Sequence, residues 1–329
     1  MLSRHFLRSK VLQSLYACEY GSASDVLTAE KNYSHNINRL NDLGLLQISS
    51  LIHLWEMADV MIEEGRNKFI PTQEERNPST RLVRNEFLRR LADNYELKSQ
   101  ISNAEITWNN EEELFRKSFT NLRKTELYKE YIAGASDKSQ SEKHNLWEED
   151  KVMAINLFRY LMNDEGLISS FVERSLWWED DFYQVAQYIM MFLKTLDQDN
   201  FDEAMVWPKI FDIRNEKDVE DFEFSRQLLL ITLRNRKEND ELIKSHLKGW
   251  EFDRVSTMDI LMINMAITEL TNCPSIPEKV TIDEYIELSK EYSSEKSKLF
   301  INGIVDKLIL ELRSEGKIRK TGRGIIGEE

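Results

Sequence analysis

The feature that most constrains the fold of this chain is the spacing of apolar residues in its last third. They recur at intervals of three and four over residues 224–231, 260–270 and 301–312. The residues concerned are Phe224, Leu228, Ile231, Ile260, Ile263, Ile267, Leu270, Ile301, Val305, Ile309 and Leu312. Such intervals place side chains on one face of an α-helix, so this region is predicted to form packed amphipathic helices.

Short motifs predict where two of these helices begin. Ser256 to Asp259 and Thr281 to Glu284 both have the spacing of a capping box, in which side chains satisfy the free N–H groups of a first helical turn. We therefore expect one helix to start near Ser256 and another at Thr281.

The rest of the chain has the same helical character. Leu7, Val11 and Leu15 repeat every four residues and predict a helix over residues 3–20. Residues 21–215 are predicted to form several helices with polar breaks. Only 11 Gly and 5 Pro occur in 329 residues, too few for many short strands joined by tight turns. The predicted fold class is all-α.

Charge and cysteine content limit the class of protein. The net charge is −14, and residues 21–215 supply most of it, with 34 acids against 23 bases. Both ends are basic, and the tail after residue 312 is expected to be disordered. Two distant cysteines do not form a disulfide framework. Charge interrupts the apolar residues of the first ten positions, and no long unbroken apolar run is evident, so the sequence predicts a cytoplasmic protein without a signal peptide or membrane span.

The motifs of catalysis and metal binding are missing from the sequence. None of the five histidines has the spacing of a zinc or di-iron site, and there is no Walker A loop or nucleophile elbow. Gly322 to Gly327 match G-x-G-x-x-G, but only two residues follow, too few for the helix that a dinucleotide site needs. We expect no cofactor, no metal and no enzyme. The tail either adds electrostatic affinity for RNA or is idle.

Residues 277–307 carry a long ordered motif, PEKVTIDEYIELSKEYSSEKSKLFINGIVDK. It closely resembles the C-terminal half of the NusB family of transcription antitermination factors. Arg8, Val11 to Gln13, Leu15 to Tyr16 and Glu19 resemble the opening of that family. The resemblance covers residues 1–20 and about 216–312, which implies a NusB-like helical bundle of two small subdomains. Residues 21–215 are then an acidic helical insertion, and 313–329 a basic disordered tail.

The resemblance implies a non-catalytic function. Members of the family bind boxA, a short single-stranded RNA element in ribosomal RNA leaders, together with the ribosomal protein NusE. The complex then loads on RNA polymerase and suppresses premature termination. The expected partners are therefore a boxA-like RNA, NusE and the polymerase antitermination complex.

Candidate binding residues follow from the resemblance and from side-chain chemistry. For RNA, they are cations, amides, an aromatic ring and a mid-helix glycine: Arg4, Arg8, Lys10, Gln13, Lys298, Phe300, Asn302, Gly303 and Lys307. For NusE, they are Tyr16 and Asp259. Simpler interpretations exist for several of them. Phe300 fits a core position better than a stacking one, Gly303 is explained more simply by helix packing, and Asp259 can cap its helix.

Two alternative functions compete with antitermination. The N-terminal arginine cluster of the family is thin here, and Ile260 and Asn264 stand where arginine is frequent in the family. The chain could therefore be an interaction scaffold that uses its acidic insertion and has weakened or lost RNA binding. NusB-like domains also precede RNA cytosine methyltransferases, but neither a glycine-rich cofactor loop nor a catalytic domain follows here.

Overall fold

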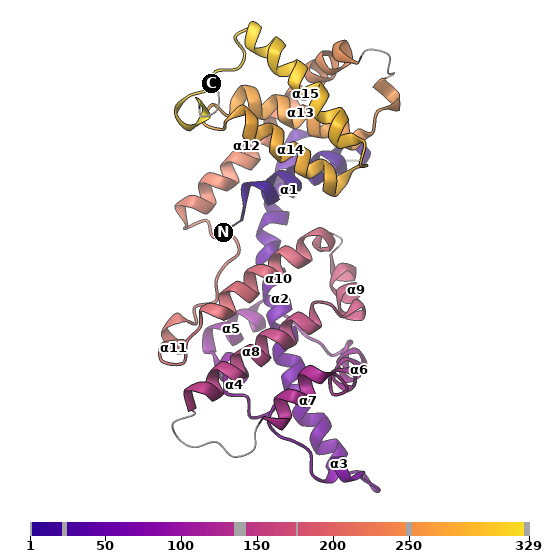
Figure 1. Ribbon diagram of the computed structural model, residues 1–329, viewed down its shortest axis with the longest axis vertical. Helices are drawn as coiled ribbons and strands as arrows, with labels where there is room; N and C mark the ends of the chain where they lie inside the picture. Colours follow the sequence, from indigo (N-terminus) through magenta and orange to yellow (C-terminus); the bar gives the residue numbers. More distant parts are fainter. Residues whose placement is uncertain (1, 22–24, 135–142, 176, 248–251, 326–329) are drawn as a thin grey trace. The chain divides into compact units, whose positions relative to one another are not determined.

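Every regular element in the described part of the chain is a helix. The computed structural model describes residues 2–21, 25–134, 143–175, 177–247 and 252–325 (Figure 1). No β-strand occurs among these residues, which confirms the predicted all-α class. The chain forms two compact units, residues 1–37 with 211–329 (unit 1) and residues 38–210 (unit 2).

Unit 1 is built around one helix that is buried along most of its length. Its helices are α1 (Arg4–Tyr20), the first part of α2 (Val26–Arg66), α12 (Glu216–His246), α13 (Thr257–Asn272), α14 (Glu278–Tyr292) and α15 (Ser297–Ser314), with short 3₁₀ turns at Phe252–Arg254 and Gly322–Ile325. In α13 every residue from Asp259 to Leu270 is buried. A helix that is apolar on nearly all sides needs neighbours on all sides, and α1, α12, α14 and α15 all pack against it (Figure 1).

The two halves of α1 lie at opposite ends of this bundle. Arg8 of α1 contacts Glu269 near the end of α13, whereas Tyr20 contacts Thr257 at its start. The two helices are therefore antiparallel. Over the 12 residues between Arg8 and Tyr20 a helix rises about 18 Å, so the N-terminal and C-terminal halves of α1 serve different surfaces.

Unit 2 holds the remaining helices around aromatic clusters. They are the rest of α2, α3 (Gln73–Arg76), α4 (Glu86–Asp93), α5 (Tyr95–Asn103), α6 (Glu112–Leu122), α7 (Glu126–Ala133), α8 (Lys143–Leu161), α9 (Glu165–Arg174), α10 (Trp178–Thr195) and α11 (Phe201–Ala204). Trp147 lies 5.3 Å from Phe87 and 5.5 Å from Phe201 between ring centroids. These contacts join α8 to α4 and α11 and bury all three rings.

A buried carboxylate links three segments of unit 2. Asp150 of α8 accepts hydrogen bonds from the Tyr131 hydroxyl at 2.8 Å and the Glu86 N–H at 2.7 Å, and forms an ion pair with Arg81 at 2.6 Å. Burial raises the pKa of Asp150 and outweighs the opposing effect of these partners. Asp150 therefore fixes α8 to the start of α4 and to α7.

The helix α2 is 41 residues long and belongs to both units. It is long and apolar enough to cross a membrane by length and composition, although 56% of its most apolar window is buried within the protein. Burial of that extent is typical of a core helix. Polar residues interrupt the apolar ones along α2, so a search for an unbroken apolar run does not detect it.

Both expected capping boxes are wrong. Helix α14 begins at Glu278, after Pro277, so Thr281 lies inside it, and its hydroxyl donates to Glu269 at 3.0 Å. Ser256 does flank the start of α13, but its side chain makes no capping hydrogen bond. The helix over residues 3–20 is confirmed as α1.

The expected disordered tail also differs from the structure. Helix α15 continues to Ser314, and residues up to 325 return to the turn that follows α13, where the Thr321 N–H donates to the Pro274 carbonyl at 2.9 Å. Residues 326–329 lie outside the described part. Backbone hydrogen bonds and close packing of a glycine hold a segment that charge and glycine content alone had marked as unstructured.

Candidate functional site

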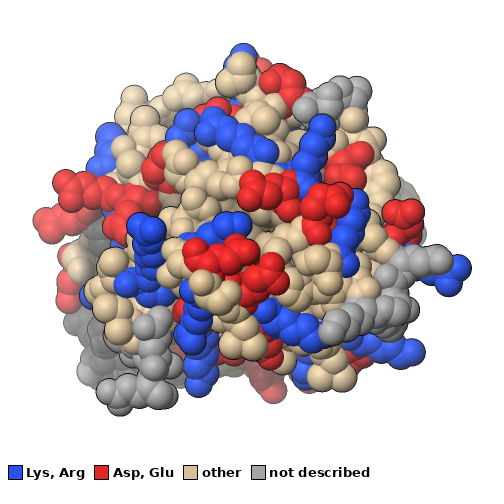
Figure 2. Space-filling model, turned by 90° about the horizontal axis from the view of Figure 1, so that it is seen from above, with Lys and Arg blue, Asp and Glu red and all other residues tan. Residues whose placement is uncertain are grey.

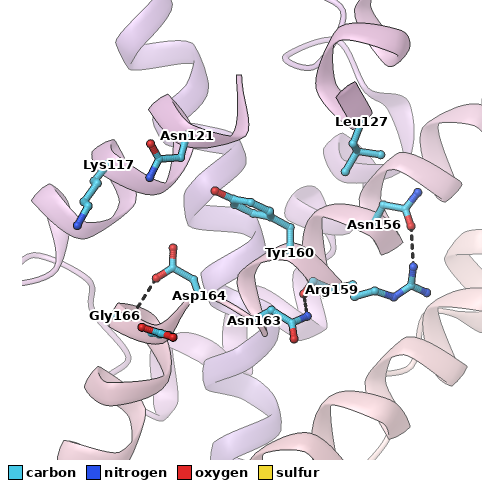
Figure 3. Close-up of a pocket in the computed structure, with 10 residues that line it drawn as sticks. Lys117, Asn121, Leu127, Asn156, Arg159, Tyr160, Asn163, Asp164 and Gly166 are labelled. Atoms are coloured by element: carbon cyan, nitrogen blue, oxygen red, sulfur yellow. Dashed lines mark hydrogen bonds between the residues drawn. The ribbon is translucent and has the colours of Figure 1, made fainter. Parts of the chain in front are cut away.

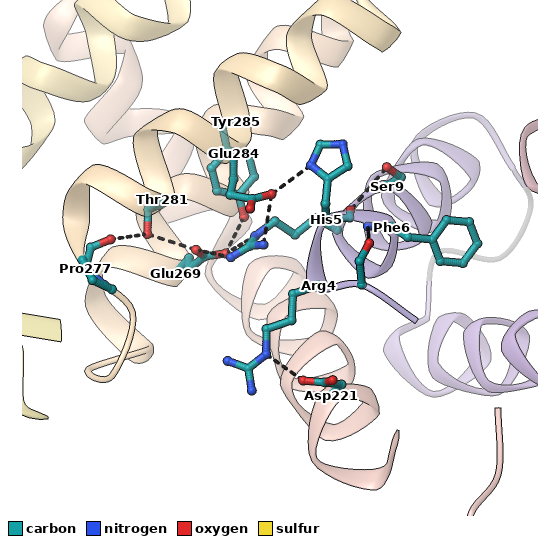
Figure 4. Close-up of polar contacts among 12 residues, drawn as sticks. Arg4, His5, Phe6, Ser9, Asp221, Glu269, Pro277, Thr281, Glu284 and Tyr285 are labelled. Atoms are coloured by element: carbon teal, nitrogen blue, oxygen red, sulfur yellow. Dashed lines mark hydrogen bonds and ion pairs between the residues drawn. The ribbon is translucent and has the colours of Figure 1, made fainter. Parts of the chain in front are cut away.

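The first half of α1 uses its cations inside unit 1. Arg8 is 1% exposed and donates two hydrogen bonds to Glu269, at 2.8 and 2.7 Å (Figure 4). Burial would lower the pKa of the Arg8 guanidinium, but its hydrogen bonds and attraction to Glu269 outweigh that effect and raise it. Glu269 also accepts hydrogen bonds from Thr281 and Tyr285. Arg8 is thus a structural cation in this conformation, and its expected contact with RNA phosphates stays a prediction that its burial does not favour.

The other N-terminal cations are buried or paired. Lys10 is 1% exposed, which does not favour its expected phosphate contact, and that contact stays a prediction. Arg4 is half-buried and pairs with Asp221 at 2.7 Å (Figure 4). It also pairs with Glu220 at 2.8 Å. Of the three, Arg4 alone keeps an accessible guanidinium, and two carboxylates already neutralise it.

His5 lies between two carboxylates of α14. Its Nδ1 is 2.8 Å from Glu284 and its Nε2 is 3.2 Å from Glu291. A neutral imidazole has one N–H, so only the charged form donates to both acceptors. The hydrogen bond to Glu284 is the largest cause raising the pKa of His5, and burial opposes it.

The second half of α1 presents aromatic residues at the surface. Tyr16 is 39% and Tyr20 65% exposed, and their ring centroids are 4.7 Å apart. The Tyr20 hydroxyl lies 2.8 Å from the Thr257 hydroxyl at the start of α13. Gln13 is half-buried, and its amide donates to the Tyr292 hydroxyl at 3.1 Å. Partly exposed aromatic rings with a polar end are typical of interface anchors.

Asp259 joins three helix ends instead of facing solvent. It is buried and accepts a hydrogen bond of 2.6 Å from Ser293, which lies 2.8 Å from Ser297 at the start of α15. Its carboxylate is used inside the bundle, so its expected direct contact with NusE stays a prediction that this burial does not favour. The same contacts bring the starts of α13 and α15 beside the end of α14, and we call this region, with Tyr16 and Tyr20, the helix-end junction.

Helix α15, which begins at this junction, carries exposed cations. Lys298 and Lys307 are exposed, and neither forms an ion pair with any described residue. Phe300 is half-buried, and Asn302 lies 3.4 Å from Asp306. A Cβ at Gly303 would meet nothing within 4 Å, so the packing explanation for this glycine is wrong. The open side of Gly303 leaves room for the backbone of a ligand.

Charges of both signs share the visible end of unit 1. Figure 2 shows Lys and Arg interspersed with Asp and Glu on this face. Separate cations at chosen positions, rather than one broad basic field, are what a negatively charged ligand would meet here.

Unit 2 contains a surface hollow of about 690 Å³ between α6, α8 and the start of α9 (Figure 3). Several of the residues around it have structural roles. The Tyr160 hydroxyl donates to the Ser118 carbonyl at 3.0 Å, and Asp164 caps α9 by accepting from the Gly166 and Leu167 N–H groups. Among the described residues, no cluster of three or more His, Cys, Asp and Glu side chains is placed to hold a metal.

The sequence analysis did not single out three residues that are important in the structure. Tyr20 and Leu299 are well exposed at the helix-end junction, whereas Glu269 is buried and binds Arg8. Glu269 did leave a signal, because it is an acidic residue within an otherwise apolar helix over 260–270 and so needed a buried partner.

The fold and this surface define a class of protein: a helical binding domain whose surface carries aromatic residues and separate cations. The comparisons identify the family. The family model described as NusB family matches residues 192–309. Transcription antitermination protein NusB of Salinibacter ruber is 34% identical over 141 residues, which cover 43% of this chain and 88% of that protein. The chain belongs to the NusB family.

Two further relatives carry the same name. The protein of Clostridium botulinum is 35% identical over 133 residues, 36% of this chain and 92% of that protein. The protein of Chloroherpeton thalassium is 34% identical over 109 residues, 33% of this chain and 52% of that protein. No solved structure matches the chain.

Proposed function

We propose that this protein is an RNA-binding transcription antitermination factor that acts without catalysis in the cytoplasm. Its ligand is a boxA-like single-stranded RNA of ribosomal RNA leaders, bound together with NusE, and the complex suppresses premature termination by RNA polymerase. The observation that carries the proposal is the 34% identity to an antitermination protein over 88% of that protein's length.

The helix-end junction supports this proposal through its chemistry. Lys298 and Lys307 are cations on α15 that no described carboxylate neutralises, and Asn302 adds an amide beside the open side of Gly303. Single-stranded RNA is bound through phosphate contacts and through unstacked bases, which such groups serve. Tyr16, in ring contact with Tyr20, is the proposed anchor for NusE.

A specific observation also favours the scaffold alternative. Arg8 and Lys10 are buried, and Arg4 is neutralised by Glu220 and Asp221. If the RNA of this family needs N-terminal cations, this chain would bind it weakly and would act through protein contacts instead.

The test is binding of a boxA-like RNA to the full chain, with and without NusE, at two salt concentrations. The proposal expects selective binding that exceeds binding of a scrambled RNA and is strengthened by NusE. The variant Lys298→Gln/Lys307→Gln should flatten the salt dependence by roughly 0.7 log units per lost phosphate contact. Tyr16→Ala should weaken the binding of NusE.

A matched control is the variant Lys194→Gln/Lys209→Gln, which removes two lysines of unit 2 and should leave RNA binding unchanged. If the chain binds NusE but does not bind RNA, the result would support the interaction-scaffold alternative. Binding of neither ligand would refute both functions.

A further inference from the structure

Residues 315–325 form a basic segment, which we call the C-terminal strap. Its basic residues are Lys317, Arg319, Lys320 and Arg323, against one acid, Glu315. The strap turns back after α15, where the N–H groups of Lys317 and Ile318 both donate to the Leu312 carbonyl, at 2.9 and 3.4 Å. Gly316 makes this turn with a φ of +68°, a left-handed conformation that favours glycine.

Specific contacts dock the strap on the turn between α13 and α14. The Thr321 N–H donates to the Pro274 carbonyl at 2.9 Å, and Lys320 Nζ donates to the Cys273 carbonyl at 3.1 Å. Gly324 is buried, and a Cβ at this position would lie 2.0 Å from the Pro274 oxygen. Because no side chain fits there, the docked strap requires glycine at 324.

Docking leaves two arginines of the strap facing solvent. Arg319 is exposed, and its contact is a hydrogen bond of 3.2 Å to the Gly316 carbonyl. Arg323 is exposed, and its side chain makes no hydrogen bond or ion pair with any described residue. The strap thus has the opposite arrangement to the start of α1, where the cations are buried or neutralised.

Arg323 borders a hollow of about 920 Å³ that it shares with the start of α1 and the start of α12. Three cations line it, Arg4, Lys217 and Arg323, together with the hydroxyls of Ser3 and Ser275. Three acids line it too, Glu216, Glu220 and Asp221, so the formal charges of the lining sum to zero in a protein with a net charge of −14. Glu220 and Asp221 both pair with Arg4, whereas Arg323 has no carboxylate partner among the described residues.

We propose that the C-terminal strap is an RNA-binding element in which Arg319 and Arg323 contact phosphates of the bound single strand, with Lys217 on the facing wall of the hollow. Guanidinium groups match phosphates with paired hydrogen bonds. The strap then supplies, at the N-terminal end of α1, the positive charge that Arg8 and Lys10 do not offer. This inference rests on the proposed function, because the strand is the RNA of that proposal.

The test measures affinity of the full chain, with NusE, for the boxA-like RNA across a salt series. Each lost phosphate contact lowers the slope of log K against log salt by about 0.7, which equals roughly 5-fold in affinity at 0.1 M salt. We therefore expect Arg319→Gln/Arg323→Gln to bind about 25-fold more weakly at that salt, with a slope lower by about 1.4. The scrambled RNA should lose the same slope, because phosphate contacts do not read sequence.

Two further variants separate charge from folding. Gly324→Ala keeps every charge but displaces the strap, so it should weaken RNA binding and speed hydrogen exchange at Thr321. Lys194→Gln/Lys209→Gln removes the same charge from unit 2 and should bind like the parent. If Arg319→Gln/Arg323→Gln binds RNA with the affinity and salt slope of the parent, the RNA-binding role of the strap is overturned and the proposed function stands. A parent chain that binds no RNA overturns both.

Discussion

Removal of the Arg8 guanidinium is the sharpest test of the interior of unit 1. The side chains of Arg8 and Glu269 are 2% and 0% exposed, and two hydrogen bonds of 2.8 and 2.7 Å join them. The variant Arg8→Met keeps most of the side-chain volume but leaves the Glu269 carboxylate buried without a cation. Each charge-assisted hydrogen bond contributes about 1.5–3 kcal/mol, and breaking one partner of a buried pair costs about 3–5 kcal/mol.

Hydrogen exchange of α1 and α13 peptides is the suitable assay, because it reports the opening of unit 1 by itself. A loss of about 3–5 kcal/mol should speed exchange roughly 150- to 4,000-fold for amides protected by that opening. Arg4→Met is the matched control, since its more exposed pair should contribute about 1 kcal/mol or less. Arg8→Met/Glu269→Gln should recover much of the loss, because no buried charge is left, and the introduced amide can accept from one of the Thr281 and Tyr285 hydroxyls and donate to the other.

Two results would refute this reasoning. The stabilising role of the Arg8–Glu269 pair is refuted if amides of Arg8→Met exchange at the same rate as those of Arg4→Met. A direct RNA role for Arg8 would be supported if the folded Arg8→Met protein lost RNA affinity and about 0.7 of salt slope.

Three other predictions follow from single positions. Because the pKa of His5 is raised above its ordinary 6.5 when folded, its contacts with Glu284 and Glu291 should stabilise the protein fully below pH 6.5, and this stability should be lost as pH rises through the folded pKa. Urea unfolding from about pH 5.5 to 8.5 should show this slope, and His5→Gln should reduce it. Gly303→Ala should stabilise α15 by about 1 kcal/mol, measured by thermal unfolding, because nothing obstructs a Cβ there. The same variant should weaken RNA binding if a strand approaches that side, and unchanged affinity would place the strand elsewhere. Asp150→Ala should destabilise unit 2 by about 3 kcal/mol, because Tyr131 and the Glu86 N–H lose their acceptor and the largely buried Arg81 loses its nearer carboxylate. Hydrogen exchange of α8 measures this loss, and a loss below about 1 kcal/mol would contradict the structural role of Asp150.

The sequence by itself determined the class of fold and the family. Apolar spacing along 3–20, 260–270 and 301–312 predicted helices that the structure confirms as α1, α13 and α15. The spacing succeeds because each of these helices buries a face, and the ordered motif over 277–307 placed the chain in its family. The starts of helices were harder to predict from the sequence. Thr281, for example, has the pattern of a helix cap but lies inside α14.

The tertiary structure alone decided which candidate residues reach the surface. Arg4 and Arg8 are four residues apart on one helix, yet Arg8 meets Glu269, 261 residues away in sequence, and is buried. The tail likewise had the composition of a disordered segment until the close fit of Gly324 against Pro274 docked it. Helical periodicity depends on near neighbours and can be read locally, whereas burial and charge pairing depend on partners that only the folded chain brings together.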